Sequence, residues 1–295
     1  MFKTISLKDI KPAEAQNYLQ HAIGPRPICF ASTIDLKGNV NLSPFSFFNL
    51  FSTNPAVVVF SPSRRARDNT TKHTLQNILE VPEVVVNIVS YDMVQQTSLA
   101  SCEYPKGTDE FIKVGFTKEP SQIIKPPRIK ESPVQMECKV LEVKPLGTGG
   151  GAGNLVIAEV LIMHINENIL NETGNIDQNK LDLVARLGGN WYTRANTSTI
   201  FEVEKPNTQL GIGVDALPEN IRNSKILTGN NLGQLANVNE PPFVDPSFED
   251  DKLKNIFLYY STDPIEMEKE LHLYAKELLD DGKVKEAWQV LLALN

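Results

Sequence analysis

Residues that build disulfide frameworks and metal sites are scarce in this sequence. Its 295 residues include three cysteines and four histidines. No two cysteines lie close together, and no C-x-x-C, H-x-x-x-H or H-E-x-x-H spacing occurs. Because disulfide-rich domains and zinc sites depend on such clusters, we expect neither of them. We interpret Cys29, Cys102 and Cys138 as free thiols, and the scattered histidines give no basis for a Ser-His-Asp triad.

A long apolar run and an excess of basic residues are also lacking. Residues 1–10 alternate charged and apolar side chains, unlike the apolar centre of a secretory signal, and no run approaches the roughly 20 apolar residues of a membrane-spanning helix. The net charge is -7, whereas binding to nucleic acid or to an anionic membrane needs an excess of Lys and Arg. We therefore expect a soluble, cytoplasmic protein without a nucleic-acid or membrane partner.

Short, β-branched apolar segments separated by turns dominate the first two thirds of the chain. They predict strands at 28–34, 56–60, 84–89, 133–143, 155–165 and 199–203. Short helices are predicted at 11–22, 70–79 and 92–100, and a loop is predicted at 107–115. Several strands with hairpin spacing and without regular helical crossovers indicate a mainly β fold, a barrel rather than a doubly wound sheet.

The chain changes character in its last third. Residues 206–262 contain loop-like stretches rich in Asn, Gly and Pro, and they predict an irregular linker. A clear helix is predicted between Asp263 and Gly282, and a second amphipathic helix at 284–294. We therefore predict two domains, which are a β domain at 1–205 and, at 206–295, a linker followed by a helical hairpin.

Residues 41–49 combine small polar side chains with aromatic rings after a candidate strand and turn. Pro44 breaks this segment, and a plain core strand would not need Ser43, Ser46 and Asn49 so close together. We therefore predict a loop that lies against a flat ring with polar edges. The alternative is that the phenylalanines of this segment are ordinary core residues.

A basic, hydroxyl-rich segment at 61–74 directly follows a predicted buried strand and leads into a helix. It contains three arginines and Lys72. Backbone N–H groups at a helix N-terminus attract an anion, and Ser, Thr, Lys and Arg side chains can complete a phosphate site. The segment therefore predicts phosphate binding, with a solvated loop as the alternative.

Two segments that contain glycine have different interpretations. Residues 186–194 place Gly188 and Gly189 beside two aromatic residues, so this segment either approaches a ligand closely or forms a turn with aromatic anchors. Residues 147–153 contain a nominal G-x-G-x-x-A dinucleotide fingerprint, but a β-branched strand follows it where the fingerprint needs a helix. We interpret residues 147–153 as a mobile hairpin loop.

The order of several short motifs makes the chain resemble a known family. The motifs are Arg26-Pro27-Ile28, the turn at Gly38, Asn41 to Phe48, Lys72-His73-Thr74 followed by Asn77-Ile78, Val85-Val86-Asn87, and Arg186-x-Gly188-Gly189-x-x-Tyr192. Over roughly residues 20–205 this ordered set is similar to the flavin reductase-like, FMN-binding split-barrel family, which includes flavoredoxin and the flavin reductase components of two-component monooxygenases. The resemblance implies a Greek-key split β-barrel that forms a homodimer and binds FMN non-covalently near the dimer interface.

The resemblance also implies roles for individual residues. The ring of FMN is expected against Asn41, Leu42, Ser43, Pro44, Phe45, Ser46 and Phe47. The phosphate is expected near Ser61, Arg64, Lys72 and Thr74, and the site is expected to be closed by Arg186, Gly188, Gly189 and Tyr192. The family usually has Asp between the Lys and the Thr, where this chain has His73, so no role follows for that side chain.

The activity that the resemblance implies is hydride transfer from NADH or NADPH to flavin, with a small-molecule electron acceptor. The flavin, and no protein side chain, is expected to carry the chemistry. Two other function classes stay open, namely an FMN electron carrier or flavoprotein that reduces a dedicated organic substrate, and a non-enzymatic FMN-binding or assembly protein. A split-barrel protein that uses pyridoxal phosphate fits the ordered motifs less well.

Overall fold

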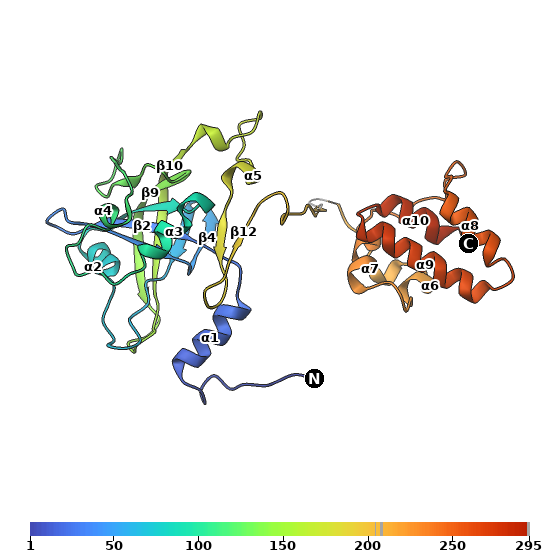
Figure 1. Ribbon diagram of the computed structural model, residues 1–295, viewed down its shortest axis with the longest axis horizontal. Coiled ribbons are helices and arrows are strands. Elements are labelled where there is room, and N and C mark those ends of the chain that lie inside the picture. Colours follow the sequence, from blue (N-terminus) through green and yellow to red (C-terminus); the bar gives the residue numbers. More distant parts are fainter. Residues whose placement is uncertain (204, 207–208, 294–295) are drawn as a thin grey trace. The chain divides into compact units, whose positions relative to one another are not determined.

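The computed structural model describes residues 1–203, 205–206 and 209–293, which belong to two compact units (Figure 1). The first unit, Met1–Phe201, contains the strands, and the second unit, Glu202–Asn295, is built from helices in its described part. Each unit has a hydrophobic core of its own.

A seven-stranded antiparallel sheet forms the body of the first unit, in the order β3-β2-β6-β9-β10-β5-β4. Its strands are β2 (Cys29–Ile34), β3 (Val40–Phe45), β4 (Phe48–Thr53), β5 (Ala56–Phe60), β6 (Glu83–Ile88), β9 (Val134–Pro145) and β10 (Asn154–Ile165). The ladder between the long strands β9 and β10 has register shifts at Ile157/Ala158 and Val160/Ile162. Such irregularities increase the local bend and twist of a sheet.

The short connection between β3 and β4 forces this sheet to curl. These two strands stand at opposite ends of the strand order, yet only Ser46 and Phe47 lie between them in the chain. Three consecutive Cα steps span at most about 11 Å, so the two edges of the sheet meet at this connection. The result is a barrel with a seam between β3 and β4. This confirms the predicted mainly β split barrel, which carries short helices and a helical C-terminal extension.

The first unit also contains short helices and two small sheets. The helices are α1 (Pro12–Ala22), α2 (His73–Glu80), α3 (Val94–Leu99), α4 (Glu110–Val114) and α5 (Gln178–Leu181), with 3-10 turns η1 (Tyr91–Met93) and η2 (Glu167–Ile169). One small sheet consists of β1 (Arg26–Pro27), β11 (Val184–Arg186) and β12 (Tyr192–Arg194), and the other of β7 (Lys118–Glu119) and β8 (Arg128–Ile129).

Both faces of β2 are covered, which explains why all of its residues are buried. Cys29 and Ala31 belong to the core cluster inside the barrel. Phe30 belongs to a second cluster, which it shares with Phe111 of α4. Its ring meets that of Phe116 edge-on, with 5.4 Å between the ring centroids. The residues of β2 are accordingly mostly apolar or β-branched, a pattern that favours a buried strand.

The predicted loop at 41–49 is wrong, because this segment forms most of β3 and the start of β4. Pro44 lies opposite Phe30 in the ladder between β3 and β2. β3 is an edge strand of the sheet, and an edge strand tolerates proline where the backbone nitrogen faces away from the neighbouring strand. The proline therefore marks an edge, not a break in the strand.

Two further local predictions are wrong. The predicted loop at 107–115 contains α4, which Asp109 caps by accepting a hydrogen bond from a first-turn N–H and which Gly115 ends in a left-handed conformation with φ of 74°. The predicted strand at 199–203, a segment that is fully described, is not a strand in the structure. The hydroxyl of its first residue instead donates to the carbonyl oxygen of Arg194 at 2.7 Å.

The second unit packs its helices around one core. They are η3 (Val214–Ala216), α6 (Glu219–Arg222), α7 (Gly229–Ala236), α8 (Asp251–Tyr259), α9 (Pro264–Asp280) and α10 (Val284–Leu292). The predicted helical hairpin is present as α9 and α10, and residue 294 of the predicted second helix lies outside the described residues. The predicted linker is wrong in part, because α7 and α8 lie within it.

Helix α7 forms in spite of its asparagines and glycines because a cap and tertiary contacts select it. The hydroxyl oxygen of Thr228 accepts a hydrogen bond from the N–H of Asn231 at 3.2 Å, and the Asn231 side chain accepts one from the Thr228 N–H at 3.0 Å. Leu235 is buried, and its carbonyl oxygen accepts a hydrogen bond from Nε1 of Trp288 at 3.2 Å.

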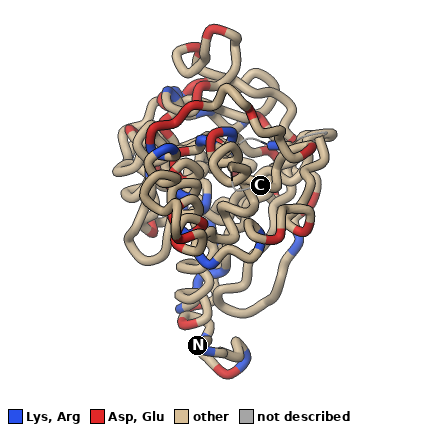
Figure 2. The backbone as a smooth tube through the Cα atoms, turned by 90° about the vertical axis from the view of Figure 1, so that its right-hand side faces the viewer, with Lys and Arg blue, Asp and Glu red and all other residues tan. Residues whose placement is uncertain are grey.

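Charged residues of both signs are spread along the backbone (Figure 2). Against this background Arg64, Arg65 and Arg67 lie within four consecutive residues of the basic segment 61–74. Within residues 1–203, 205–206 and 209–293, no helix combines the length and the apolar character that crossing a membrane requires.

Helix α1 has no buried residue of its own within its described side chains and is held by a buried arginine from β1. Nη1 of Arg26 donates to the carbonyl oxygens of Gln20 at 2.6 Å and of Ile23 at 2.5 Å, and Nη2 donates to the carbonyl oxygen of Leu187 at 2.9 Å. A cation suits the C-terminal end of a helix, where carbonyl groups lack intrahelical partners. Arg26 therefore joins α1 to the hairpin of β11 and β12.

Gly188, at the turn of that hairpin, packs against α1. A Cβ atom at this position would lie 2.3 Å from ring atoms of His21. The His21 ring is itself fixed, because its Nδ1 lies 2.7 Å from the carbonyl oxygen of Asn17. A residue without a side chain is thus needed for the contact between the hairpin and α1.

We predict that Gly188→Ala loosens the attachment of α1. The added methyl group overlaps His21, and overlap of this kind costs about 1–2 kcal/mol. Amide hydrogen exchange across residues 12–23 should therefore become several-fold faster. Gly149→Ala is the matched control, because a Cβ there meets no atom within 4 Å. Equal exchange in both variants would contradict the packing role of Gly188.

Candidate ligand-binding site

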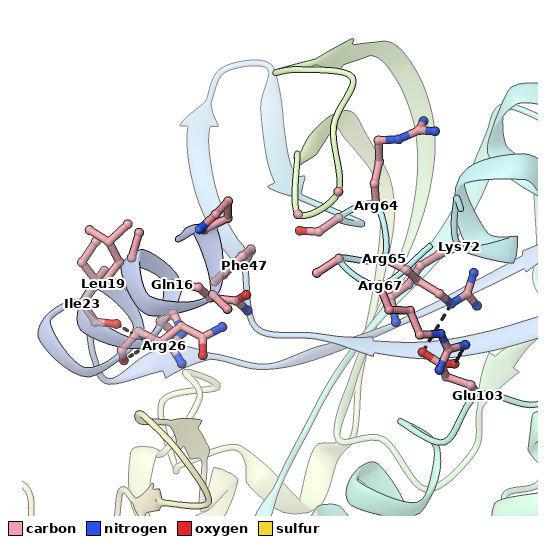
Figure 3. A pocket seen from close by; sticks show the side chains of 18 residues that line it. Gln16, Leu19, Ile23, Arg26, Phe47, Arg64, Arg65, Arg67, Lys72 and Glu103 are labelled. Carbon is pink, nitrogen blue, oxygen red and sulfur yellow. Dashed lines mark hydrogen bonds and ion pairs between the residues drawn. The ribbon is translucent and has the colours of Figure 1, made fainter. Parts of the chain in front are cut away.

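A cavity of about 790 Å³ lies between α1 and the basic segment (Figure 3). Helix α1 contributes Gln16 and Leu19 to its lining, and its C-cap residue contributes Ile23. Phe47 reaches the cavity from the connection between β3 and β4. The volume falls within the roughly 300–1,000 Å³ that is typical of small-molecule sites. The cavity therefore has room for a ligand of cofactor size, with apolar side chains at α1 and cations on the opposite side.

The loop between β9 and β10 holds the basic segment in place by close backbone contact. The N–H of Arg64 donates to the carbonyl oxygen of Ala152 at 2.8 Å, and the N–H of Gly151 donates to the carbonyl oxygen of Arg64 at 3.0 Å. A Cβ atom on Gly150 would lie 2.9 Å from a carbonyl oxygen of the basic segment. The predicted hairpin loop at 147–153 is present between β9 and β10, and its glycines permit this close approach, while its mobility stays a prediction.

The two adjacent arginines of the basic segment have different surroundings. Arg64 turns back on its own loop, since its Nε and Nη2 both donate to Asn69 at 2.6 Å. Arg65 is anchored through Nη1, which donates to the hydroxyl of Thr70 at 3.0 Å. Figure 3 shows Arg64 directed away from Arg65 and Lys72. The structure therefore places Arg65, and not the predicted Arg64, beside Lys72.

Arg65, Arg67 and Lys72 form a cationic cluster at one end of the cavity, with Glu103 as an anionic neighbour. Oε1 of Glu103 lies 3.4 Å from Nε of Arg65, and Oε2 pairs with Nη2 of Arg67. Nε of Arg65 is buried and has no hydrogen-bond partner within the described part of the chain. A buried donor without an acceptor is costly, so the cluster suits an anionic ligand.

The pKa values of neighbouring groups respond to this concentration of cations. Burial lowers the pKa of Lys72, the charge of Arg65 lowers it further, and the charge of Glu103 acts in the opposite direction. Burial also lowers the pKa of His73, with the charges of Arg65, Lys106 and Lys72 as further causes. His73 is therefore neutral at pH 7. A bound anion would reduce the repulsion among these groups.

Helix α2 begins at the cationic cluster. Its N-cap residue is Lys72, and within the described residues no side chain caps it with a hydrogen bond. The N–H groups of a first helical turn lack intrahelical partners, and the helix dipole favours negative charge at this end. The start of α2 and the cationic cluster thus act on the same region of the cavity.

A second hollow of about 30 Å³ adjoins the larger cavity and shares Arg65, Lys72 and Glu103 with it. Here Nδ2 of Asn41 donates to Oγ1 of Thr74 at 3.0 Å, and both side chains are buried. A volume of about 30 Å³ equals the share of one water molecule in the liquid. The hydrogen-bonded pair of Asn41 and Thr74 lines this hollow together with Arg65 and Lys72 of the cationic cluster.

The structure brings only part of the predicted site residues to these two cavities. Those that line one of them are Asn41, Leu42, Ser43, Phe47, Arg64, Lys72 and Thr74. Those that lie outside both linings, as the described residues define them, are Pro44, Phe45, Ser46, Ser61, Arg186, Gly188, Gly189 and Tyr192.

The residues outside the linings have other contacts. Phe45 is buried in the barrel core. The guanidinium of Arg186 stacks on the ring of Tyr192 at 4.4 Å, and its Nη2 donates to the carbonyl oxygen of Gly189 at 2.6 Å. In this unit the segment 186–192 is thus a hairpin that stabilises itself and packs against α1.

Several cavity residues carry no assignment from the sequence. Arg65 and Arg67 belong to the basic segment, so composition indicates their region but not which arginine faces the cavity. Glu103 lies 36 residues beyond Arg67, and no local pattern links the two. Arg26 and α1 precede the predicted site, and their part in the cavity depends on how the first strand and the last hairpin pair.

Comparisons with known proteins agree with this geometry. The sequence matches the flavin reductase like domain family over residues 23–182, which is more than half of the chain. An uncharacterized protein of Aquifex aeolicus is 39% identical over 171 residues, a stretch that covers 58% of this chain and 85% of that protein. The matched range contains the seven strands of the barrel, the basic segment and α2.

Solved structures share the fold of the first unit. Nitrilotriacetate monooxygenase component B from Bacillus cereus superposes with a TM-score of 0.64 at 27% identity, over 69% of this chain and 99% of that chain. A protein with a split barrel domain from Shewanella frigidimarina superposes with a TM-score of 0.57 at 24% identity, over 67% of this chain and 96% of that one. At the latter identity the likeness concerns the fold alone. Taken with the match over residues 23–182, these findings show that the chain belongs to the flavin reductase-like domain family.

Proposed function

We propose that this chain is a flavin-dependent oxidoreductase that binds FMN non-covalently and transfers hydride from NADH or NADPH to the flavin. Membership of the family supports flavin chemistry. The observation that carries the choice of FMN is the cationic cluster at one end of the 790 Å³ cavity, in which Nε of Arg65 has no hydrogen-bond partner among the described residues. A flavin with a phosphate group satisfies this cluster, whereas riboflavin does not.

The phosphate end of the ligand would be held by charges of the chain itself. Lys72 and Arg65 would donate charge-assisted hydrogen bonds, and N–H groups at the start of α2 would add to them. Each hydrogen bond to a charged group contributes about 1.5–3 kcal/mol. A bound anion would also offset the repulsion by Arg65 that lowers the pKa of Lys72.

The opposite part of the cavity suits a ring. When bound, the isoalloxazine ring supplies the hydride chemistry of the reaction. Phe47 is 42% exposed and offers an aromatic face. Leu19 of α1 and its C-cap residue Ile23 are exposed apolar side chains in the lining, and their role would be to bind the ring and to keep water from it. Orientation of the two reactants contributes much of the rate in such reactions.

We also propose that the chain forms a homodimer through the outer face of the barrel. Strands β4, β9 and β10 carry exposed apolar side chains, which are Leu50, Phe51, Leu141, Leu161 and Met163. Large exposed apolar patches commonly mark protein interfaces, and these side chains are the ones that such a patch on the sheet would use. Because β4 directly follows Phe47, a partner on this face would lie near the cavity.

The cytoplasm is the compartment that we propose for this reaction, because free thiols stay reduced there. The electron acceptor is proposed as a small molecule. An FMN electron carrier and an enzyme with a dedicated organic substrate would use the same cavity, and a non-enzymatic FMN-binding protein would bind flavin without turnover. The kinetic measurement below separates these functions.

We predict that Lys72→Gln weakens FMN binding about tenfold or more, because it removes one charge-assisted hydrogen bond to the phosphate. Fluorescence titration measures the dissociation constants of FMN and of riboflavin, and the value for riboflavin should not change. Lys106→Gln is the matched control, because its Nζ is exposed and donates to Gln76 at 3.2 Å. An unchanged FMN affinity in Lys72→Gln would show that the phosphate does not bind at this cluster.

We predict that the purified protein oxidises NADH or NADPH when FMN is present. Stopped-flow absorbance should show flavin reduction, and added free flavin should increase steady-state turnover many-fold. Reduction of the bound flavin without turnover of free flavin would indicate a carrier or a dedicated enzyme. Flavin binding without any oxidation of NADH or NADPH would indicate a non-enzymatic protein.

We predict that Leu161→Asp converts a dimer to a monomer, because a buried and unpaired charge at an interface costs several kcal/mol. Sedimentation equilibrium at micromolar concentration measures the mass. Ile112→Asp, which changes an exposed apolar residue of α4, should leave the dimer intact. A wild-type protein that is already monomeric would refute the interface.

A further inference from the structure

Glu103 stands apart from the other charged residues of the cavity because of its sign. It follows α3, and its two carboxylate oxygens reach two different arginines of the basic segment. Oε1 lies 3.4 Å from Nε of Arg65, and Oε2 pairs with Nη2 of Arg67. One carboxylate thus bridges two of the cations that would hold the phosphate in the function proposed above (Figure 3).

The same carboxylate also acts on the third cation of the cluster. The charge of Glu103 raises the pKa of Lys72, against the stronger lowering by burial and by Arg65. Glu103 lines the larger cavity as well as the small hollow beside it. The negative charge that an external anion would bring to this region is therefore supplied in part by the chain.

The contact with Arg65 is incomplete as a hydrogen bond. Although Glu103 lies within ion-pair distance, Nε of Arg65 remains without a hydrogen-bond partner among the described residues. The carboxylate carries one negative charge, whereas a phosphate monoester carries about 1.5 to 2 at pH 7 and offers three acceptor oxygens. A phosphate can therefore satisfy these donors better than Glu103 does.

Displacement of Glu103 needs little rearrangement. Its side chain is 42% exposed and that of Arg67 is 68% exposed. The Glu103 side chain can rotate into solvent and free Arg67 for another anion, while the backbone of the basic segment stays in its contact with the β9–β10 loop. The exchange of one anion for the other is thus a matter of side-chain rotation.

We propose that Glu103 is a built-in competitor for the phosphate group of the ligand, which keeps the ligand exchangeable. This inference rests on the proposed FMN function and adds to it. A ligand phosphate gains the contacts with Arg65, Arg67 and Lys72, but the ion pairs of Glu103 are lost or shared at the same time. The net affinity is lower than the cationic cluster alone would give, and the ligand is released faster. FMN then behaves as a substrate that binds and dissociates during turnover, in contrast to a permanently bound prosthetic group.

The test compares wild type with Glu103→Gln, which keeps the shape of the side chain and removes its charge. Fluorescence titration should show FMN binding about three- to tenfold tighter in the variant, a range that matches the modest strength of partly exposed ion pairs. Stopped-flow release of FMN should slow by a similar factor. Riboflavin affinity should stay the same, because riboflavin has no phosphate. Glu167→Gln is the control for net charge, because Glu167 is exposed and lies in η2, outside both linings as described.

The outcomes separate the inference from the proposed function. Unchanged or weaker FMN binding in both Glu103→Gln and Glu103→Ala, with wild-type circular dichroism, would overturn the role of Glu103. Equal tightening of riboflavin and FMN would overturn it as well. If wild type binds neither flavin, the proposed function fails, and calorimetric titration with inorganic phosphate then tests Glu103 alone. Tighter phosphate binding in Glu103→Gln would support competition at the cluster, and unchanged phosphate binding would overturn it.

Discussion

The connection between β3 and β4 is the constraint on which the rest of the first unit depends. Two residues join strands that occupy opposite edges of a seven-stranded sheet. The sheet must therefore curl until its edges meet, and the seam lies where Phe47 projects into the large cavity. A barrel without a seam would close this position with strand-to-strand hydrogen bonds. The ligand site thus follows from the way in which the barrel is closed.

The seam is also tied to the basic segment. The N–H of Ser61 donates to the carbonyl oxygen of Phe47 at 2.9 Å, so the residue that follows β5 is bonded to a residue of the β3–β4 connection. The Oγ of Ser61 packs against the β9–β10 loop, since a Cβ on Gly153 would lie 2.6 Å from it, and its predicted contact with phosphate stays a prediction. The backbone hydrogen bond between Ser61 and Phe47 joins the β3–β4 connection to the start of the basic segment.

The sequence was sufficient for features that arise from local pattern, and insufficient for those that arise from tertiary contact. β5 and β6 were predicted from runs of β-branched apolar residues, and β2 from a run that is mostly apolar or β-branched, as is typical of strands buried on both faces. β3 was missed because Pro44 is unfavourable inside a sheet, and its place on an edge cannot be known without the strand order. α7 was missed because its stability comes from burial and a cap, which outweigh low helix propensity.

The same division holds for the candidate site. The basic segment was predicted from its composition, yet the choice between Arg64 and Arg65 depends on the turn at Asn69, which has a φ of 57° and draws Arg64 back. The segment 186–192 was assigned to the ligand because glycine beside an aromatic residue suits both ligand approach and tight packing. His21, against which Gly188 packs in the structure, is 167 residues away from it in the chain, and contact of this segment with a ligand stays a prediction.

The way in which α1 is anchored determines how the width of this cavity can change through substitution. One wall of the cavity is a helix that contributes no buried side chain and whose last carbonyl groups are held by Arg26. The other wall is fixed to the barrel through the β9–β10 loop. The width of the site can therefore change through substitutions near one guanidinium while the barrel core and the cationic cluster stay as they are. Such substitutions can alter the size of ligand that the cavity admits without altering the residues on which the fold and the cationic cluster depend.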